Sequence, residues 1–342
     1  MPLKSETKTI NWKKVEHYLK NELNLPISEP IQVDPFTSGY SNLTYRISIG
    51  DWEGVLRRPP FGYLPPKAHD MEREYRLLST IHPLYPKAPA PYLFCNDPDV
   101  MDRHFYVMEL KNGVVIDDKL PEKWNNIEQK QCISETFIDE LSLLHSIDFD
   151  VSSLGKPEGY LKRQVEGWIT RYDRARTPNT PDAADLETYF CAQKPESPAA
   201  TLVHNDFKLN NIMFKTERPD TIVAVFDWEM TTIGDPLLDL GISLAYWTEK
   251  DEAFTSLTAV TNQPGFYSRK QLAERYGEKT GRDLTNLPYY VSFAFYKIAA
   301  VLQQIYYRYK ESGSFEERFE RLPEGILTLI EQSRKAAIGE IV

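Results

Sequence analysis

The chain has 342 residues with a formal net charge of -10, and 41% of its residues are hydrophobic. That composition provides for a sizeable core and excludes global disorder, while the acidic balance argues against general binding to nucleic acid or to an anionic membrane. The cysteines Cys95, Cys132 and Cys191 are far apart and have no metal-binding spacing, so we expect reduced thiols in a cytoplasmic protein. The first residues lack the apolar stretch of a signal peptide.

The first third of the chain reads as a small β-rich lobe. Apolar residues at helical spacing predict an amphipathic helix at 11–25. Short β-rich runs separated by turn signals predict two or three antiparallel strands within 31–60. A helix over 67–81 and a buried strand over 105–110 follow. We therefore expect an N-terminal lobe at 1–110 that grips nucleotide phosphates.

The rest of the chain is predicted to be mainly helical. We expect two long helices at 127–147 and 160–176, followed by a surface insertion around a short helix at 177–200. Two β-like runs at 201–204 and 221–227 and a buried helix at 289–307 complete the expected elements. The last stretch is the most apolar, but Lys297 and two glutamines interrupt it, so we expect no membrane span. The sequence thus predicts an α+β bilobal fold with a larger C-terminal lobe at 111–342.

One short stretch, "TLVHNDFKLNNIMF" at 201–214, carries His204, Asp206 and Asn211 directly after a β-like run. Phosphoryl transfer needs a carboxylate to orient the acceptor hydroxyl, and hard oxygen ligands for magnesium. The spacing H-x-D-x-x-x-x-N supplies this set, and Asp227 in "VAVFDWEM" supplies a second metal-binding carboxylate. Taken singly, these side chains are a structural histidine, a turn residue and a helix cap; their joint order at two strand ends favours chemistry.

The N-terminal lobe offers partners for the phosphates. Arg57 ends the strand "GVLRRPP" at the position where kinases carry a cation, and Glu74 on the next helix is its expected partner, with Glu72 as a substitute. An arginine there is a departure, because a guanidinium binds phosphate in a fork rather than as a point charge. The alternative is that Arg57 and Arg58 are exposed edge-strand charges.

Two further segments are candidate nucleotide contacts. The hairpin "TSGYSNLTY" has one glycine but is small and polar enough to cover phosphates, through Ser38, Gly39, Ser41 and Asn42. An ordinary β-turn explains it equally well. The connector "MELKNG" can present the backbone of Glu109 and Leu110 to adenine, or can simply be a strand end.

These motifs together resemble the aminoglycoside phosphotransferase and choline kinase superfamily, whose signature is H-G-D-x-x-x-x-N followed by D-W-E and G-D-P-x-x-D-L. The segments "GYSNLTYRI", "VLRRPP", "FYVMEL" and "EGYLKRQVEGWITRYDRAR" look most like the kinase domain that precedes acyl-CoA dehydrogenase modules, and its stand-alone bacterial relatives. The similarity covers nearly all of 30–310, and Asn205 replaces the usual glycine. The chain ends at Val342, so we expect no dehydrogenase module.

The resemblance implies a protein-kinase-like fold, ATP and Mg²⁺. By position it implies that Asp206 is the catalytic base and that Asn211 and Asp227 are metal ligands. Arg57 and Glu74 would form the ion pair on the phosphate side. Of the remaining positions, Asp239 in "GDPLLDLG" would stay structural and brace the catalytic loop, as we also expect of the His204 ring.

The acceptor is expected to be a small molecule with a hydroxyl group. Arg163, Arg171 and Arg174 lie roughly on one side of the helix at 160–176, which suits an anionic acceptor such as a hydroxyacyl-CoA; the alternative is a solvated helix face. Two other functions stay open. An aminoglycoside or choline-like amino-alcohol kinase would need a ring of carboxylates, for which the candidates are Asp182, Asp185, Glu187 and Glu229. The second open function is a pseudokinase that binds nucleotide without catalysis. A protein kinase is disfavoured, because the chain lacks an A-P-E-like segment.

Overall fold

The computed structural model describes residues 10–36, 42–62, 69–149, 154–255, 257, 260–312 and 317–342. Its chain divides into two compact units. The first consists of Met1–Asn112 with the short segment Ala224–Glu229, and the second of Gly113–Val223 with Met230–Val342. The segment 224–229 therefore returns to the first unit, which the sequence did not predict.

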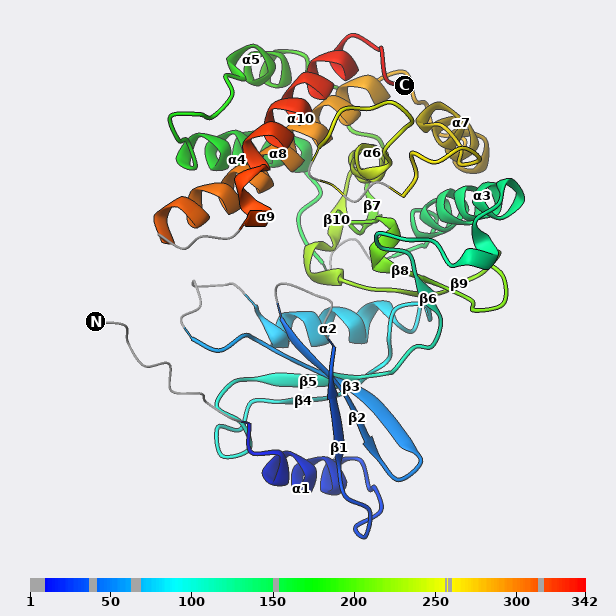
Figure 1. Ribbon diagram of the computed structural model, residues 1–342, viewed down its shortest axis with the longest axis vertical. Helices are drawn as coiled ribbons and strands as arrows, with labels where there is room; N and C mark the ends of the chain where they lie inside the picture. Colours follow the sequence, from blue (N-terminus) through cyan, green and yellow to red (C-terminus); the bar gives the residue numbers. More distant parts are fainter. Residues whose placement is uncertain are drawn as a thin grey trace. The chain divides into compact units, whose positions relative to one another are not determined.

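The first unit is built on an antiparallel sheet in the order β1-β2-β3-β5-β4 (Figure 1). The strands are β1 (Gln32–Pro35), β2 (Leu43–Ile49), β3 (Trp52–Arg58), β4 (Pro91–Cys95) and β5 (Phe105–Met108). Two helices accompany it, α1 (Trp12–Glu22) and α2 (Met71–Ile81). The predicted helices and antiparallel strands of this region are confirmed, although α2 begins only at Met71, after the side chain of Asp70 caps its N-terminus.

Alternation along the strands decides which side chains reach each helix. Leu56 and Val107, which are register partners on β3 and β5, join the apolar cluster that also contains Val15 and Leu19 of α1. The next pair along the same strands is Arg57 and Tyr106, whose side chains point to the opposite face. This alternation carries the polar side chains to the face where α2 contributes Glu74.

The second unit is mainly helical, as predicted. Its elements are β6 (Val114–Val115), η1 (Glu122–Trp124), α3 (Ile127–Leu144), α4 (Tyr160–Arg174), α5 (Ala184–Ala192), β7 (Thr201–Val203), η2 (Leu209–Asn211), β8 (Ile212–Phe214), β9 (Ile222–Val225), η3 (Trp228–Met230), β10 (Thr232–Gly234), α6 (Pro236–Tyr246), α7 (Arg269–Thr280), α8 (Leu287–Ser312), α9 (Glu317–Glu320) and α10 (Leu322–Ala337). η3 and the end of β9 lie on the segment that returns to the first unit. β7 pairs with β10, and β8 lies between β6 and β9.

Helix α8 is the centre of this unit. It packs against α6 and against α10, which runs alongside it in Figure 1. Gly241 on α6 permits the close approach, because a Cβ there would lie 2.8 Å from the carbonyl oxygen of Tyr290 on α8. No helix within the described residues is long and apolar enough to cross a membrane.

Candidate functional site

Arg57 is the hub of a charged cluster in the first unit. Its Nε lies 3.1 Å from Oε2 of Glu74, and its Nη2 lies 3.3 Å from Oδ1 of Asp227 and 4.0 Å from Oε2 of Glu229. The partner on α2 is Glu74 because Glu72 is turned toward Arg76, one helical turn away. Thus one guanidinium engages three carboxylates that come from two distant parts of the sequence.

The position of Arg57 on an internal strand excludes the alternative of edge-strand charges. β3 pairs with β2 on one side and with β5 on the other. Arg57 keeps only 15% of its side chain exposed, and Arg58 is fully buried, with Asp102 as its ion-pair partner at 3.1 Å. Burying two arginines inside a sheet is costly unless each is paired, and each is.

Glu74 is held from a second side by Tyr106, whose hydroxyl donates to Oε2 at 3.0 Å. Burial raises the pKa of Glu74, while Arg57 and this hydrogen bond act in the opposite direction. Burial, together with the nearby Glu74 carboxylate, also raises the pKa of Tyr106 well above its ordinary value, although Arg57 opposes this. The hydroxyl therefore stays protonated and serves as a donor.

Of the four phosphate contacts predicted in the hairpin, Asn42 lies within the described part of the chain, whereas Ser38, Gly39 and Ser41 lie outside it. Its side-chain amide is 2.7 Å from Nδ1 of His69. In the amide orientation that satisfies both groups, its oxygen accepts from Nε and Nη2 of Arg57 at 3.1 and 2.9 Å. Asn42 therefore belongs to the Arg57 cluster.

A small hollow of about 40 Å³ opens beside this cluster. Its lining combines charged side chains with an apolar wall, and consists of Arg57, Glu74, Leu78, Pro89, Tyr106, Met108, Phe226, Asp227, Trp228 and Glu229. The volume is that of a few water molecules. A phosphate oxygen or a hydrated cation is the size of group that it can take.

The returning segment is anchored at both ends. The Val225 N–H donates to the Lys87 carbonyl at 2.9 Å, and Arg73 of α2 donates to the Glu229 carbonyl at 2.6 Å. Between them Asp227 has a φ of 63°, in the left-handed region that non-glycine residues seldom adopt. Such strained residues cluster at functional sites, because the surrounding structure must hold them there.

The connector residues are partly occupied. The Glu109 N–H donates to the Ala90 carbonyl at 2.8 Å, and the Glu109 carboxylate accepts from the Ala90 N–H and pairs with Lys111. A purine base at this connector must therefore use other backbone groups, such as the Glu109 carbonyl or those of Leu110.

The second unit carries Asp206 on the loop between β7 and η2. Its Oδ2 accepts from Nδ2 of Asn211 at 2.8 Å and lies 3.0 Å from Nζ of Lys208. Its other oxygen, Oδ1, receives no hydrogen bond from the described residues, and the side chain is 18% exposed. The carboxylate is thus fixed through one oxygen and presents the other as an acceptor for an incoming hydroxyl.

Asn211 is oriented by the same contacts. Its Nδ2 also donates to the Asp206 carbonyl, at 2.9 Å. With the amide nitrogen anchored twice, the oxygen Oδ1 is turned away from Asp206 and accepts nothing from the described residues. An amide oxygen in this position is a hard ligand of the kind that magnesium prefers.

Asp239 supports the start of this loop from α6. Its Oδ2 accepts from the His204 N–H at 2.6 Å and its Oδ1 from the Asn205 N–H at 2.7 Å, while Nε2 of His145 lies 3.1 Å from Oδ2. Burial by itself raises the pKa of Asp239, but the hydrogen bond and charge of His145 and the backbone bond from His204 bring the pKa below its ordinary value. The His204 ring accepts from the Asp206 N–H at 3.3 Å.

Asn205 explains how this chain does without a glycine before Asp206. Its φ is 64°, and asparagine is among the few residues that tolerate this conformation. Its side chain accepts from the Tyr160 hydroxyl at 2.7 Å and donates to the Met230 carbonyl at 3.0 Å. The departure from the family pattern therefore adds two bonds that a glycine cannot make.

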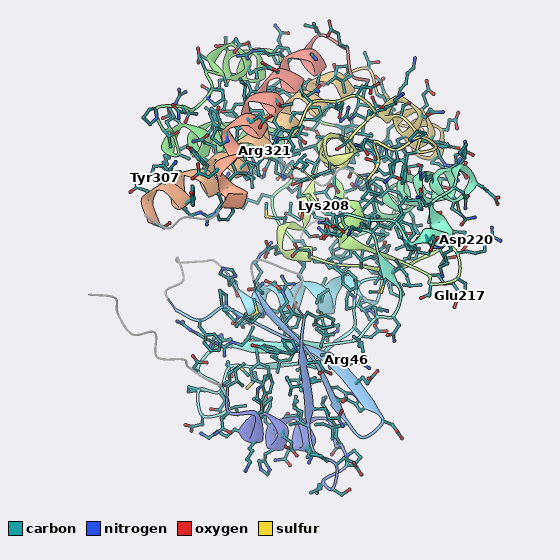
Figure 2. All side chains as sticks on the ribbon, viewed as in Figure 1. Arg46, Lys208, Glu217, Asp220, Tyr307 and Arg321 are labelled. Carbon is teal, nitrogen blue, oxygen red and sulfur yellow. The ribbon has the colours of Figure 1, made fainter. Side chains whose placement is uncertain are left out.

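Two lysines near Asp206 were assigned no role at the site from the sequence alone. Lys208, labelled in Figure 2, pairs with Asp206 and lies 4.8 Å above the ring of Tyr246. Lys208 lies two residues after Asp206, and this closeness in the sequence could have identified it. Lys297 on α8 donates to the Asn205 carbonyl at 3.2 Å, and no sequence signal linked it to the loop.

The three arginines of α4 share one exposed face. Arg163, Arg171 and Arg174 line a shallow hollow of about 390 Å³ with Glu166, Gly167 and Thr170. Arg171 lies 4.6 Å above the buried ring of Trp168, whereas Arg163 donates to the carbonyls of Glu158 and Lys156. This face of α4 is exposed to solvent, which fits the alternative of a solvated helix face. It also gathers positive charge, which an anionic acceptor would need.

Two of the carboxylates proposed for a cationic acceptor, those of Asp185 and Glu187, already have partners. Asp185 forms two contacts of 2.8 and 2.9 Å with Arg334, which also donates to the Asp182 carbonyl. Glu187 accepts from the Tyr296 hydroxyl at 2.9 Å. Arg334 compensates the charge of Asp185, and Arg176, 3.9 Å away, that of Glu187, so these two carboxylates are not free for an ammonium ligand.

Comparison with known proteins places this geometry in a family. The model of the phosphotransferase enzyme family matches residues 32–270. Mouse (Mus musculus) acyl-CoA dehydrogenase family member 10 is 32% identical over 306 residues, and human (Homo sapiens) acyl-CoA dehydrogenase family member 11 is 30% identical over 307 residues. These alignments cover 86% and 87% of this chain but only 28% and 39% of the relatives, so the chain spans about a third of their length.

Solved structures agree on the fold. A protein of Ralstonia eutropha JMP134 described as a candidate aminoglycoside phosphotransferase superposes with a TM-score of 0.77 at 23% identity, covering 96% of this chain and 99% of that one. Choline kinase of Cryptosporidium parvum gives 0.64 at 14% identity, covering 95% and 96%. Spectinomycin phosphotransferase, solved with ADP and spectinomycin, gives 0.57 at 14% identity, covering 97% and 99%.

The chain belongs to the phosphotransferase enzyme family, and its fold is the bilobal kinase-like one that the sequence predicted.

Proposed function

We propose that this chain is an ATP- and magnesium-dependent kinase that phosphorylates the hydroxyl group of a hydroxyacyl-CoA-type acceptor. The observation that carries the kinase assignment is the Asp206 carboxylate, which Asn211 and Lys208 hold through Oδ2 while Oδ1 stays available. A base must lie within hydrogen-bond reach of the proton that it takes, and a carboxylate fixed through one oxygen meets this need. The relative solved with ADP supports ATP as the donor.

Each unit has its own task in this proposal. In the first unit, Arg57 with its partner Glu74 binds phosphate oxygens through the guanidinium fork, and Asn42 orients that fork. In the second unit, Asp206 orients the acceptor hydroxyl and takes its proton as the oxygen attacks phosphorus. His204 and Asp239 act only by bracing the loop.

The donor set suits magnesium. Asn211 contributes an amide oxygen and Asp227 a carboxylate, and we propose both as its ligands. Within the described residues no group of three or more His, Cys, Asp and Glu side chains forms a protein-only metal site. Magnesium in kinases takes one or two protein carboxylates and completes its shell with phosphate oxygens and water. When bound, it neutralises phosphate charge.

The acceptor class rests on charge. The α4 hollow with Arg163, Arg171 and Arg174 suits the phosphates of a CoA thioester. In the insertion, Asp185 already pairs with Arg334, and Glu187 lies 3.9 Å from Arg176. The relatives named as acyl-CoA dehydrogenase family members favour the same class of acceptor. An amino-alcohol acceptor has no comparable support.

The test is acceptor-dependent ADP release with magnesium-ATP across hydroxyacyl-CoA esters, aminoglycosides and choline-like amino alcohols. Asp206→Asn must abolish turnover. Arg171→Gln combined with Arg174→Gln should raise KM for the CoA ester about thirtyfold and leave KM for ATP unchanged, since the two lost phosphate contacts are worth on the order of 1 kcal/mol each. Lys162→Gln, a charge on the same helix paired with Glu166, is the matched control. Turnover only with cationic acceptors would overturn the acceptor proposal, and ATP binding without any turnover would favour a pseudokinase.

A further inference from the structure

Helix α8 buries a lysine in the middle of its apolar run. Lys297 is 7% exposed and lies between Tyr296 and Ile298, both of which are buried. Transferring an ammonium group out of water costs several kcal/mol unless a partner compensates it. A buried lysine in such a place therefore needs a function or a strong partner.

The partner is the catalytic loop. Nζ of Lys297 donates to the Asn205 carbonyl at 3.2 Å and lies 5.6 Å above the ring of Trp168. An ammonium has three donors, and within the described part of the chain only this one carbonyl accepts from it. Lys297 reaches the loop from α8. The contacts to the Asp206 carboxylate come from Asn211 and Lys208, which are residues of the loop region itself.

The carbonyl that Lys297 holds belongs to the strained residue directly before Asp206. The N–H of Asn205 is held by Asp239, and its side chain by Tyr160 and the Met230 carbonyl. Lys297 anchors the remaining polar group. With all four groups bound, the peptide that leads into Asp206 has one orientation.

We propose that Lys297 is a positioning residue of the phosphoryl-transfer step: by holding the Asn205 carbonyl it sets the direction in which the Asp206 side chain projects. The inference rests on the proposed kinase function. It concerns orientation alone, because the lysine acts on the reaction through the Asn205–Asp206 peptide. An error of about 1 Å in the placement of a reacting group can cost on the order of 100-fold in rate.

The charge of Lys297 adds a signature to this role. Burial lowers its pKa to about 8, while Asp206 from the loop and Asp239 from α6 oppose that shift and Lys208 and Arg171 reinforce it. Below this pH the ammonium donates strongly to the carbonyl, and above it a neutral amine donates weakly. The kcat of the wild type should therefore fall as pH rises through about 8.

Three variants test the proposal. Lys297→Met keeps the length of the side chain and removes the donor, Lys297→Arg keeps a permanent charge, and Lys310→Met alters an exposed lysine of the same helix as a control. We expect Lys297→Met to lower kcat at least tenfold with KM for ATP unchanged, and to abolish the alkaline fall. Lys297→Arg should restore part of kcat and move the fall upward by at least one pH unit. A Lys297→Met variant that keeps kcat within about twofold and the same alkaline fall would overturn the proposal.

Amide hydrogen exchange separates this inference from the kinase assignment. Lys297→Met should speed exchange across 204–211 about tenfold, because a freed Asn205 peptide loosens the loop, and Lys310→Met should not. If the wild type transfers phosphate to no acceptor but exchange responds as expected, the kinase proposal fails and the role in phosphoryl transfer fails with it, whereas the anchoring of the Asn205 carbonyl by Lys297 stands. If exchange over 204–211 is unchanged, the positioning role is wrong.

Discussion

Asp239 and Asp235 lie four residues apart at the start of α6 and are both buried, yet we expect very different losses of stability from the same substitution. Asp239 accepts from two backbone N–H groups, of His204 and Asn205, with His145 beside it. In Asp239→Asn the amide keeps one acceptor oxygen, and its NH₂ group faces the other backbone N–H. One buried donor is then unsatisfied at a cost of about 1–3 kcal/mol, and the loss of charge weakens the remaining bonds by about 1 kcal/mol.

We therefore expect Asp239→Asn to lower the free energy of unfolding by about 3 kcal/mol. Asp235→Asn should cost about 1 kcal/mol or less. Asp235 accepts from the Leu237 N–H and the Tyr290 hydroxyl, and asparagine caps a helix as well as aspartate while the hydroxyl can turn to accept. Burial also raises the pKa of Asp235, so its charge is already disfavoured.

Urea unfolding at pH 7, followed by tryptophan fluorescence, measures both variants. With a slope of about 3 kcal/mol per M, the midpoint should fall by about 1 M for Asp239→Asn and by less than half of that for Asp235→Asn. The lowered pKa of Asp239 stabilises the fold above about pH 4, and this contribution is lost as pH falls through the folded value. The difference between wild type and Asp239→Asn should therefore shrink in acid. Equal losses for the two variants would refute the reasoning.

Three further predictions concern the site. Arg57→Lys should weaken ATP binding about tenfold by calorimetry, because an ammonium cannot span Glu74 and Asp227 and still present a fork to phosphate; unchanged affinity would show that the fork is not used. Asn205→Gly should lower the free energy of unfolding by about 1–2 kcal/mol through loss of its bonds to Tyr160 and Met230, and Asn205→Ala by more, because only alanine strains the left-handed backbone. The difference in the free energy of unfolding between the wild type and Lys297→Met should change with pH. As pH increases from about 8 to 10.5, the wild type should gain about 3 kcal/mol, because the lysine of the unfolded chain still holds a proton that the folded chain has released. A difference that does not change with pH would contradict the lowered pKa.

The elements and the loop of the second unit could be predicted because their signals are local. The helical spacing around Val15 and Leu19 is a property of neighbouring residues. The cap at Asp70 is equally local, but the prediction did not use it and began that helix at residue 67. The same holds for the order of His204, Asp206 and Asn211, since one loop of eight residues contains the whole set. Figure 1 also shows elements that were not predicted individually. They are the helices α6, α7 and α10, the strand β4, and short strands such as β8 and β10, whose three residues carry little periodicity.

What the sequence by itself determined was therefore the class of fold, the family and the residue types for phosphoryl transfer, because these depend on order and spacing along the chain. The tertiary structure decided which distant groups meet. It brought Asp227 back to Arg57 across 170 positions and set the buried Lys297 against the carbonyl before Asp206. Such contacts depend on how helices and strands pack, since burial and pairing are settled only when the elements fold together.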